Sequence, residues 1–190
     1  MLISLIVPCY NEEEAMPLFY KEASRVAAEM KASHGAEFEF IFVDDGSRDG
    51  TLRVARELHA QDPRVRYVSF SRNFGKEAGI YAGLQAAKGD YVATMDADLQ
   101  DDVDVIDKMV EKYYEGNDVV YGVRSARDTD TFFKKFTAEG FYKIMQAMGV
   151  EIVFNHADYR LMSKRALEGL SEFREVNLFL RGKRWRSIKK

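Results

Sequence analysis

Residues 2–7 read Leu2-Ile3-Ser4-Leu5-Ile6-Val7, an apolar run that a helical pattern follows from Glu12 to about Ser33. Residues 38–43 form the next apolar run, and this alternation of apolar runs with helical patterns continues to residue 123. Strands that alternate with helices of about ten or more residues are typical of right-handed βαβ units. We therefore predict an α/β fold with a mostly parallel central sheet flanked by helices.

Each predicted element has a residue range. The predicted strands cover 2–7, 38–43, 65–70, 90–95 and 119–122, and the predicted helices cover about 12–33, 51–59, 77–87 and 104–114. Within the third of these helices, Gly79 and Gly83 lie four residues apart, which favours close packing of that helix on the sheet. Beyond residue 123 we expect a helix over about 131–148, a strand at 155–162 and a short helix at 163–170. The helix over 131–148 is basic and amphipathic, which suits either a core-facing helix or one on a membrane surface.

The composition is that of an ordinary globular domain, with 190 residues of which 46% are hydrophobic and 31% charged. The single cysteine, Cys9, excludes an internal disulfide. No apolar run approaches the roughly 18 residues that a membrane-spanning helix needs. We therefore expect neither a disulfide scaffold, nor a disordered tail, nor an integral membrane protein in the chain as written.

Charge is divided unevenly along the chain. Residues 1–123 carry 13 Lys and Arg against 23 Asp and Glu, whereas residues 124–190 carry 15 against 8. An acidic half suits a cation site, and a basic half suits an anionic partner such as a phosphate, a nucleic acid or a membrane surface. Chance drift of surface charge is the alternative explanation.

Three of the predicted strands end in residues that suit a phosphorylated nucleoside. Tyr10 follows the first strand, where its ring can lie against a nucleobase. Asp44 and Asp45 follow the second strand, and such carboxylates accept hydrogen bonds from a base N–H or a ribose hydroxyl. Lys76 follows the third strand and Gly75, at a helix N-terminus, where a phosphate is readily held. Plain turns and helix caps explain each of these segments equally well when it is taken alone.

The fourth strand ends in Asp96-Ala97-Asp98-Leu99-Gln100. In an extended segment Asp96 and Asp98 point the same way, and Gln100 continues that spacing if the chain stays extended. Two carboxylates and an amide oxygen suit Mg²⁺ or Mn²⁺, with substrate phosphates and water as the remaining ligands. The alternative is that these acids only precede an acidic helix N-terminus at 101–107.

Four of these segments together resemble the signature of family-two glycosyltransferases of the GT-A, Rossmann-like fold. In chain order they are Pro8-Cys9-Tyr10-Asn11-Glu12, residues 43–51, Asn73-Phe74-Gly75-Lys76 and residues 96–101. Residues 124–130 and 155–160 resemble the polyprenyl-phosphate branch, which includes bactoprenol glucosyltransferases and dolichol-phosphate mannose synthases. The resemblance covers a catalytic domain at 1–182, with a nucleotide and metal half at 1–123, an acceptor half at 124–182 and a basic tail at 183–190.

The resemblance implies an inverting, metal-dependent transfer of a sugar, glucose first, from a UDP-sugar to a polyprenyl phosphate such as undecaprenyl phosphate. Mg²⁺ or Mn²⁺ is the implied cofactor. The implied nucleotide-sugar ligands are Pro8, Tyr10, Glu12, Asp44, Asp45, Lys76, Asp96 and Ala97. The implied metal ligands are Asp96, Asp98 and Gln100, and the implied catalytic residues are Asp98, Asp158, Arg124, Arg127 and Arg160.

The resemblance also implies a nucleotide-sugar donor, a lipid acceptor and the cytoplasmic face of a membrane, with peripheral attachment for the chain as written. Relatives of this branch continue into membrane-spanning helices, and they often form homo-oligomers. A GDP-mannose donor and a saccharide hydroxyl acceptor are alternatives, and Asp158 is then the candidate general base. A non-catalytic nucleotide-binding module and a nucleic-acid binder are the other classes. We expect no nucleic acid, because the first half is acidic and no nucleic-acid motif is present.

Overall fold

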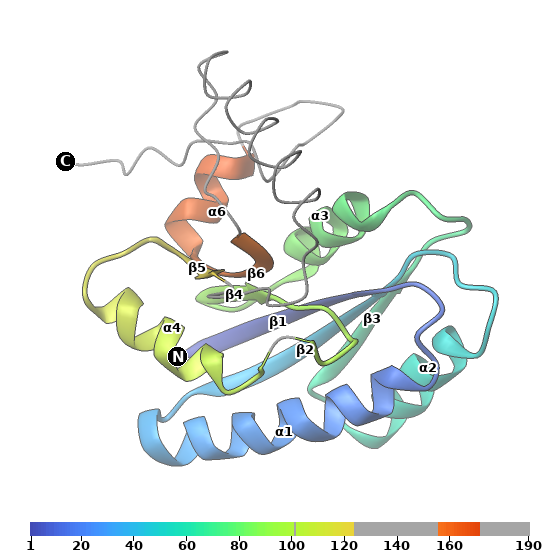
Figure 1. The fold of residues 1–190 in the computed structure, drawn as a ribbon, viewed down its shortest axis with the longest axis horizontal. Coiled ribbons are helices and arrows are strands. Elements are labelled where there is room, and N and C mark those ends of the chain that lie inside the picture. Colours follow the sequence, from blue (N-terminus) through green and yellow to red (C-terminus); the bar gives the residue numbers. More distant parts are fainter. Residues whose placement is uncertain (101, 124–155, 172–190) are drawn as a thin grey trace, which may run out of the picture.

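The computed structural model describes residues 1–100, 102–123 and 156–171 (Figure 1). The strands are β1 (Leu2–Cys9), β2 (Glu37–Asp44), β3 (Val65–Ser69), β4 (Tyr91–Thr94), β5 (Val119–Val123) and β6 (His156–Ser163). The helices are α1 (Ala15–His34), α2 (Thr51–Gln61), α3 (Lys76–Ala86), α4 (Val105–Tyr114) and α6 (Lys164–Ser171). The predicted elements of these ranges are present, with bounds that differ by a few residues.

The described strands form one six-stranded sheet in the order β3-β2-β1-β4-β6-β5. β1 pairs in parallel with β2 and with β4, and β2 pairs in parallel with β3. The chain therefore moves outward from β1 to β3 and then returns to the other side of β1 with β4. In sheets of this kind, ligands bind beyond the carboxyl ends of the strands at the point where the strand order reverses. The fold thus directs attention to the ends of β1 and β4.

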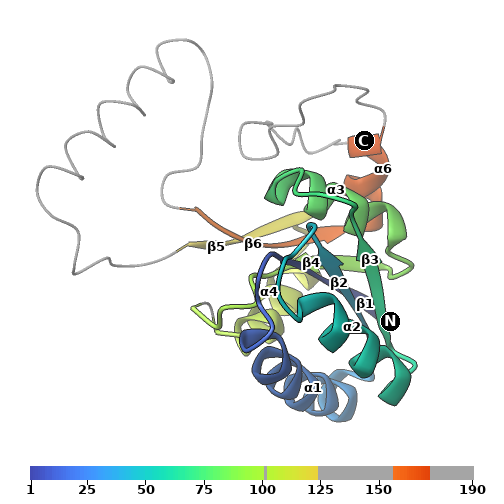
Figure 2. The ribbon, with the colours of Figure 1, turned by 90° about the vertical axis from the view of Figure 1, so that its right-hand side faces the viewer.

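Helices cover both faces of the sheet, with α1, α2 and α4 on one side and α3 and α6 on the other (Figure 2). Side chains of a strand alternate between the two faces. Accordingly Leu5 and Val7 belong to the core shared with Phe19 of α1, whereas Ile6 packs against Ala82 of α3. The predicted α/β fold is confirmed.

The strand expected at 155–162 is present as β6, but its antiparallel place in the sheet is not part of the sequence prediction. β6 lies between β4 and β5 and is antiparallel to both. Residues 156–163 belong to the predicted acceptor half at 124–182. They are nevertheless part of the same sheet as the strands of residues 1–123. None of the helices within the described residues is both long and apolar enough to cross a bilayer.

α3 lies unusually close to β1, as its two glycines predict. A methyl group added at Gly83 would stand 2.3 Å from Cγ2 of Ile6, and one at Gly79 would stand 3.6 Å from Cβ of Pro8. Only a residue without a side chain fits at Gly83. The close approach places the first turn of α3, which begins at Lys76, beside the end of β1.

We predict that Asp62, at the end of α2, stabilises the fold in a pH-dependent way. The guanidinium of Arg64 and the hydroxyl of Tyr20, at 2.7 and 2.5 Å, hold the pKa of the Asp62 carboxyl at about 2. Because this value lies below the ordinary one, the stabilisation is present above about pH 4 and is lost as the pH falls toward 2. Asp62→Asn should lower the free energy of unfolding by about 1–2 kcal/mol at pH 7.

Urea denaturation at several pH values measures this effect. The difference in unfolding free energy between wild type and Asp62→Asn should shrink as the pH falls toward 2, where the native carboxyl takes up its proton. Glu57→Gln is the matched control, because Glu57 forms an exposed pair with Arg53 within α2 at 2.9 Å. That change should cost at most about 0.5 kcal/mol. A difference for Asp62→Asn that is independent of pH would contradict the prediction.

Candidate functional site

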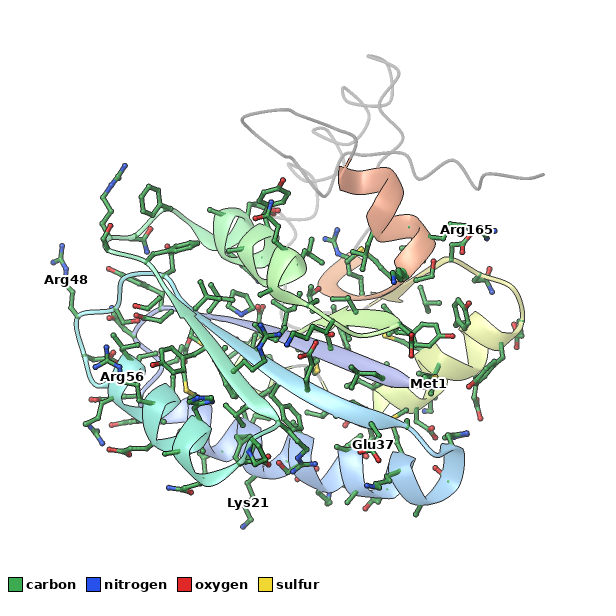
Figure 3. The ribbon with its side chains drawn as sticks, turned by 180° about the vertical axis from the view of Figure 1, so that it is seen from behind. Met1, Lys21, Glu37, Arg48, Arg56 and Arg165 are labelled. Carbon is green, nitrogen blue, oxygen red and sulfur yellow. The ribbon has the colours of Figure 1, made fainter. Side chains whose placement is uncertain are left out.

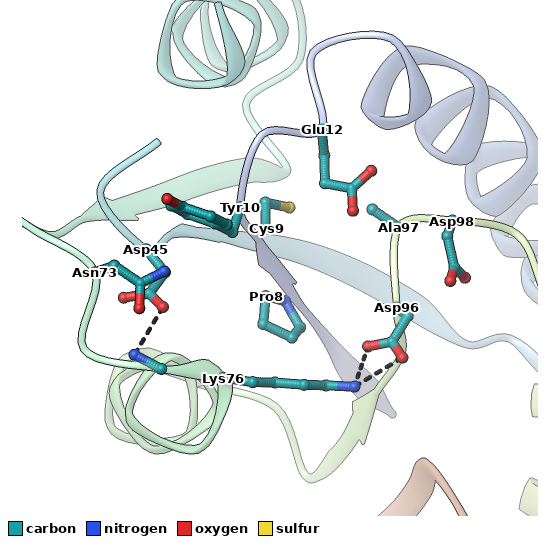
Figure 4. Close-up of a pocket in the computed structure, with 11 residues that line it drawn as sticks. Pro8, Cys9, Tyr10, Glu12, Asp45, Asn73, Lys76, Asp96, Ala97 and Asp98 are labelled. Atoms are coloured by element: carbon teal, nitrogen blue, oxygen red, sulfur yellow. Dashed lines mark hydrogen bonds and ion pairs between the residues drawn. The ribbon is translucent and has the colours of Figure 1, made fainter. Parts of the chain in front are cut away.

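A pocket of about 340 Å³ lies where β1 and β4 end (Figure 4). Segments that follow β1, β2, β3 and β4 contribute to its wall, as expected for the carboxyl edge of a parallel sheet. Figure 3 shows the molecule from behind. Arg48, in the loop after β2, lies at the opposite end of the sheet from Met1 and Glu37, where β1 and β2 start. The lining residues are Pro8, Cys9, Tyr10, Glu12, Asp45, Asn73, Gly75, Lys76, Asp96, Ala97 and Asp98.

One end of the pocket combines an aromatic ring with hydrogen-bonding groups. Tyr10 stands beside Asp45 and Asn73, and its side chain is 42% exposed (Figure 4). A ring exposed at a pocket wall can stack on a planar ligand, while the amide and carboxylate beside it can bond the ligand's polar edge. This end of the pocket is therefore suited to a nucleoside.

The two neighbouring aspartates of this end have different roles. Asp45 is buried and accepts hydrogen bonds from the backbone N–H groups of Phe74 and Gly75, at 2.7 and 2.8 Å. Asp44 is also buried, but it accepts from Ser47 N–H and Ser69 Oγ, at 3.0 and 2.9 Å. Asp45 lines the pocket and Asp44 does not, so the structure places Asp44 in the support of the loop rather than on the ligand side.

The other end of the pocket is charged. Lys76, the first residue of α3, reaches across beside Pro8 to Asp96, and its Nζ lies 2.7 Å from both carboxylate oxygens (Figure 4). Asp98 lies next to Asp96 on the same wall and is exposed. An ammonium group and two carboxylates at one end can hold phosphates and a cation together.

Gln100 does not line this pocket. The sequence places it beside Asp96 and Asp98 only if the chain stays extended, and the chain does not. β4 ends at Thr94, and the chain then turns, with Leu99 at a φ of 55°. The turn is closed by a 3.1 Å hydrogen bond from Gln100 N–H to Oδ1 of Asp98. Gln100 is exposed and lies outside the pocket, because the period of two ends with the strand.

Negative charge is concentrated around Glu12. Burial of its carboxyl, followed by the charges of Asp98, Asp96 and Asp49, raises the pKa of Glu12 above its ordinary value. Such crowding is relieved by a bound cation. Within the described parts of the chain, no three Asp, Glu, His or Cys side chains are arranged to hold a metal by themselves. Asp96 and Asp98 could supply two carboxylate ligands to a divalent ion, with ligand phosphates and water as the others, which is the usual arrangement for Mg²⁺.

The chain as a whole matches known sequences. The sequence model described as "Glycosyl transferase family 2" matches residues 4–171. The chain belongs to this family. A bactoprenol glucosyl transferase of Shigella phage SfV is 45% identical over 183 residues, which are 96% of this chain and 58% of that protein. The uncharacterized glycosyltransferase YkoT of Bacillus subtilis is 42% identical over 185 residues, 95% of this chain and 55% of that protein.

The family-2 chain thus spans little more than half the length of these relatives. Among solved structures, the mannosyltransferase PcManGT from Pyrobaculum calidifontis, in complex with GDP-Man and Mn²⁺, superposes with a TM-score of 0.59. It is 21% identical, and the match covers 88% of this chain and 46% of that one. The family resemblance and the GT-A fold are both confirmed.

Eight of the residues expected in the family-2 site lie together in the pocket. They are Pro8, Tyr10, Glu12, Asp45, Lys76, Asp96, Ala97 and Asp98. Cys9, Asn73 and Gly75 also line the pocket, and they belong to the motifs that carry the resemblance although none of them had an assigned role there. Burial, followed by the charges of Glu12, Asp44 and Asp96, raises the pKa of the Cys9 thiol.

The acceptor residues expected of a family-2 enzyme are described only in part. Arg124, Arg127 and the expected helix over 131–148 lie outside the described residues, as does the tail at 183–190. Asp158 lies on β6. Arg160, on the same strand, is 1% exposed and pairs in register with Thr94, two residues before Asp96. It does not line the pocket, and its place on the acceptor side stays a prediction.

The loop that carries Tyr10 and Glu12 is locked to the loop after β2. Asn11 N–H donates to Ser47 Oγ at 3.0 Å, and Arg48 N–H returns a bond to Asn11 Oδ1 at 2.9 Å. Glu12 N–H donates to Thr51 Oγ1 at 2.7 Å. Asn11 is held at a φ of 57°, which is uncommon for a residue other than glycine. These bonds fix the pocket wall before any ligand binds.

We predict that Thr51→Val weakens donor binding roughly tenfold, because it removes the acceptor for Glu12 N–H and frees the loop. Thr51 is fully buried and also donates to Oδ1 of Asp49 at 2.6 Å. Valine has the same shape but no hydroxyl, whereas Thr51→Ser keeps the hydroxyl and is the control. Calorimetric titration with UDP measures the effect. Equal affinities of the valine and serine variants would show that the hydroxyl does not position the loop.

Proposed function

We propose that this chain is the sugar-transferring domain of an enzyme that moves glucose from UDP-glucose to a polyprenyl phosphate with inversion. The observation that carries the proposal is the polarity of the pocket, with Tyr10 and Asp45 at one end and Lys76, Asp96 and Asp98 at the other. A nucleoside diphosphate has the same polarity. The 45% identity to a protein called bactoprenol glucosyl transferase supports glucose as the sugar and a polyprenyl acceptor.

In this proposal the uracil ring lies against Tyr10, and Asp45 with Asn73 bonds its polar edge or the ribose. Lys76 then holds the diphosphate. Asp96 and Asp98 hold Mg²⁺ or Mn²⁺ through carboxylate oxygens, and the metal, when bound, stabilises the negative charge that develops on the leaving UDP. The sugar points out of the charged end, toward the side of the sheet where β6 runs beside β4.

The acceptor phosphate attacks the anomeric carbon in a single displacement, which inverts that centre. A polyprenyl phosphate is already an anion at neutral pH, so the protein need not supply a general base. Arginines that orient this phosphate behind the sugar lower the barrier by positioning. We assign this role to Arg124, Arg127 and the pair Asp158 and Arg160. Because the acceptor is a lipid, the domain works at a membrane surface, on the cytoplasmic side.

Calorimetric titration tests the donor. UDP, GDP, UDP-glucose and GDP-mannose are each titrated into the protein with Mn²⁺ and again with EDTA. We expect binding of the uridine compounds that weakens when the metal is removed. Binding of guanosine compounds alone would replace the proposal with a mannosyltransferase that uses GDP-mannose. Absence of binding by all four would overturn the donor site itself.

The acceptor is tested separately with Asp158→Asn. Transfer to a polyprenyl phosphate should be weakened but retained, because no base is needed. If the true acceptor is a saccharide hydroxyl, Asp158 is the candidate base, and its loss should abolish transfer to that acceptor. A wild-type protein that glucosylates a saccharide but not a polyprenyl phosphate would refute the lipid acceptor.

A further inference from the structure

The pocket contains a positively charged side chain of the protein itself, that of Lys76. Among the described residues that line it, Glu12, Asp45, Asp96 and Asp98 are acidic and Lys76 is the basic one. The ammonium group of Lys76 lies within 2.7 Å of both oxygens of Asp96. Lys76 and Asp96 are the groups to which the proposed function assigns the diphosphate and the metal. In the protein without ligand, each of them is therefore engaged by the other.

This ion pair is weak enough to be exchanged. The side chains of Lys76 and Asp96 are 37% and 29% exposed, and pairs of this kind contribute only about 0–1 kcal/mol. The pair also joins two separate elements, since Lys76 begins α3 and Asp96 follows β4. The long side chain of Lys76 crosses the pocket to make the contact (Figure 4). The flexible stem of a lysine side chain lets its ammonium group move from Asp96 to a ligand in the pocket.

From this geometry we infer that Lys76 is an internal counter-ion, which occupies Asp96 in the free protein and passes to the diphosphate as the divalent metal takes its place. The inference rests on the proposed function and adds to it a coupling between the two ligands. Without nucleotide, the ammonium group repels a divalent cation at Asp96. With nucleotide, the diphosphate draws the ammonium group away. Metal and nucleotide therefore strengthen each other's binding, by the same factor in either order.

Lys76→Gln separates this arrangement from a simple phosphate contact. If Lys76 only held the diphosphate, its removal would weaken nucleotide binding and leave Mn²⁺ binding alone unchanged. As a counter-ion, its removal should make Mn²⁺ bind roughly tenfold more tightly in the absence of nucleotide. Nucleotide binding should weaken in the same variant, and the factor by which Mn²⁺ strengthens UDP binding should fall several-fold. One substitution thus changes two affinities in opposite directions.

The experiment uses the 190-residue chain. Free Mn²⁺ is followed by electron paramagnetic resonance, first with the metal alone and then with UDP, or with GDP if the wild type selects it. Lys76→Arg keeps the charge and should preserve the coupling. Lys112→Gln is the matched control, because Lys112 forms an exposed pair with Glu115 at the end of α4, and neither residue lines the pocket. Lys76→Met serves as a second neutral variant if the glutamine variant does not fold.

The outcomes distinguish this inference from the proposed function. A wild type that binds neither UDP nor GDP with Mn²⁺ would overturn the proposed function. A wild type that binds them, with Mn²⁺ affinity and coupling unaltered in the neutral variants, would overturn the counter-ion inference alone. Tighter Mn²⁺ binding in Lys76→Gln and Lys76→Met, but not in Lys112→Gln, would establish it.

Discussion

Asp98→Asn is expected to reduce sugar transfer at least about a hundredfold while leaving the fold intact. Asp98 is exposed at the charged end of the pocket, so its replacement costs little stability. Its carboxylate is one of the two that we assign to the divalent metal. Asparagine has nearly the same shape but lacks the charge, so the metal should bind more weakly and UDP should lose its dependence on Mn²⁺. Steady-state kinetics and Mn²⁺ titration measure the two effects.

Asp102→Asn is a closely matched control for this change. Oδ1 of Asp102 accepts a 3.0 Å bond from Asp104 N–H, just as Oδ1 of Asp98 accepts a 3.1 Å bond from Gln100 N–H. Both carboxylates are exposed, and both close a local turn in the same acidic segment. Only Asp98 lines the pocket. Equal losses of activity in the two variants would point to the charge of the segment as a whole and would contradict a metal role for Asp98.

The sequence was sufficient for the fold because each element is consistent with its local pattern. β1 and β2 are buried apolar runs, and α2 and α4 have clear helical periods. The position of β6 could not be predicted in the same way. Its pairing with β4 joins Thr94 to Arg160, which are far apart in the chain, and alternation along the sequence carries no information about such partners.

The site was predictable to the extent that strand ends determine it. Tyr10 and Asp45 directly follow a strand, Asp96 comes two residues after one, and Lys76 begins a helix. The sheet brings the four together. Two of the expected site residues, Asp44 and Gln100, do not line this pocket.

The adjacent acids 44 and 45 are the first case. Asp44 accepts hydrogen bonds from Ser47 N–H and Ser69 Oγ, and of the two only Asp45 lines the pocket. The segment after Asp98 turns at Leu99 and carries Gln100 away. Turn geometry of this kind depends on hydrogen bonds that a spacing rule does not contain.

Gly46→Ala is expected to lower the free energy of unfolding by about 3 kcal/mol or more and to weaken UDP binding as well. Gly46 follows Asp45 at a φ of 67°, in the left-handed region. A methyl group there would stand 2.4 Å from the carbonyl carbon of Arg72 and 2.7 Å from the backbone nitrogen of Asn73. These are backbone atoms, so the loop that carries Asn73 must move. Because Asp45 holds this loop through Phe74 and Gly75, the nucleoside end of the pocket moves with it.

Gly35→Ala separates the clash from the backbone strain. Gly35 ends α1 at a φ of 64°, nearly that of Gly46, but an added methyl group there has no atom within 4 Å. Its replacement should therefore cost only the strain, about 1 kcal/mol, and should leave UDP affinity unchanged. Urea denaturation gives the two stabilities, and calorimetry gives the two affinities. The loss of unfolding free energy in Gly46→Ala, minus that in Gly35→Ala, then measures how tightly the loops after β2 and β3 are packed against each other. If the two variants are equally stable, the loop after β3 moves aside at little cost in free energy. The nucleoside end of the pocket is then not preorganised.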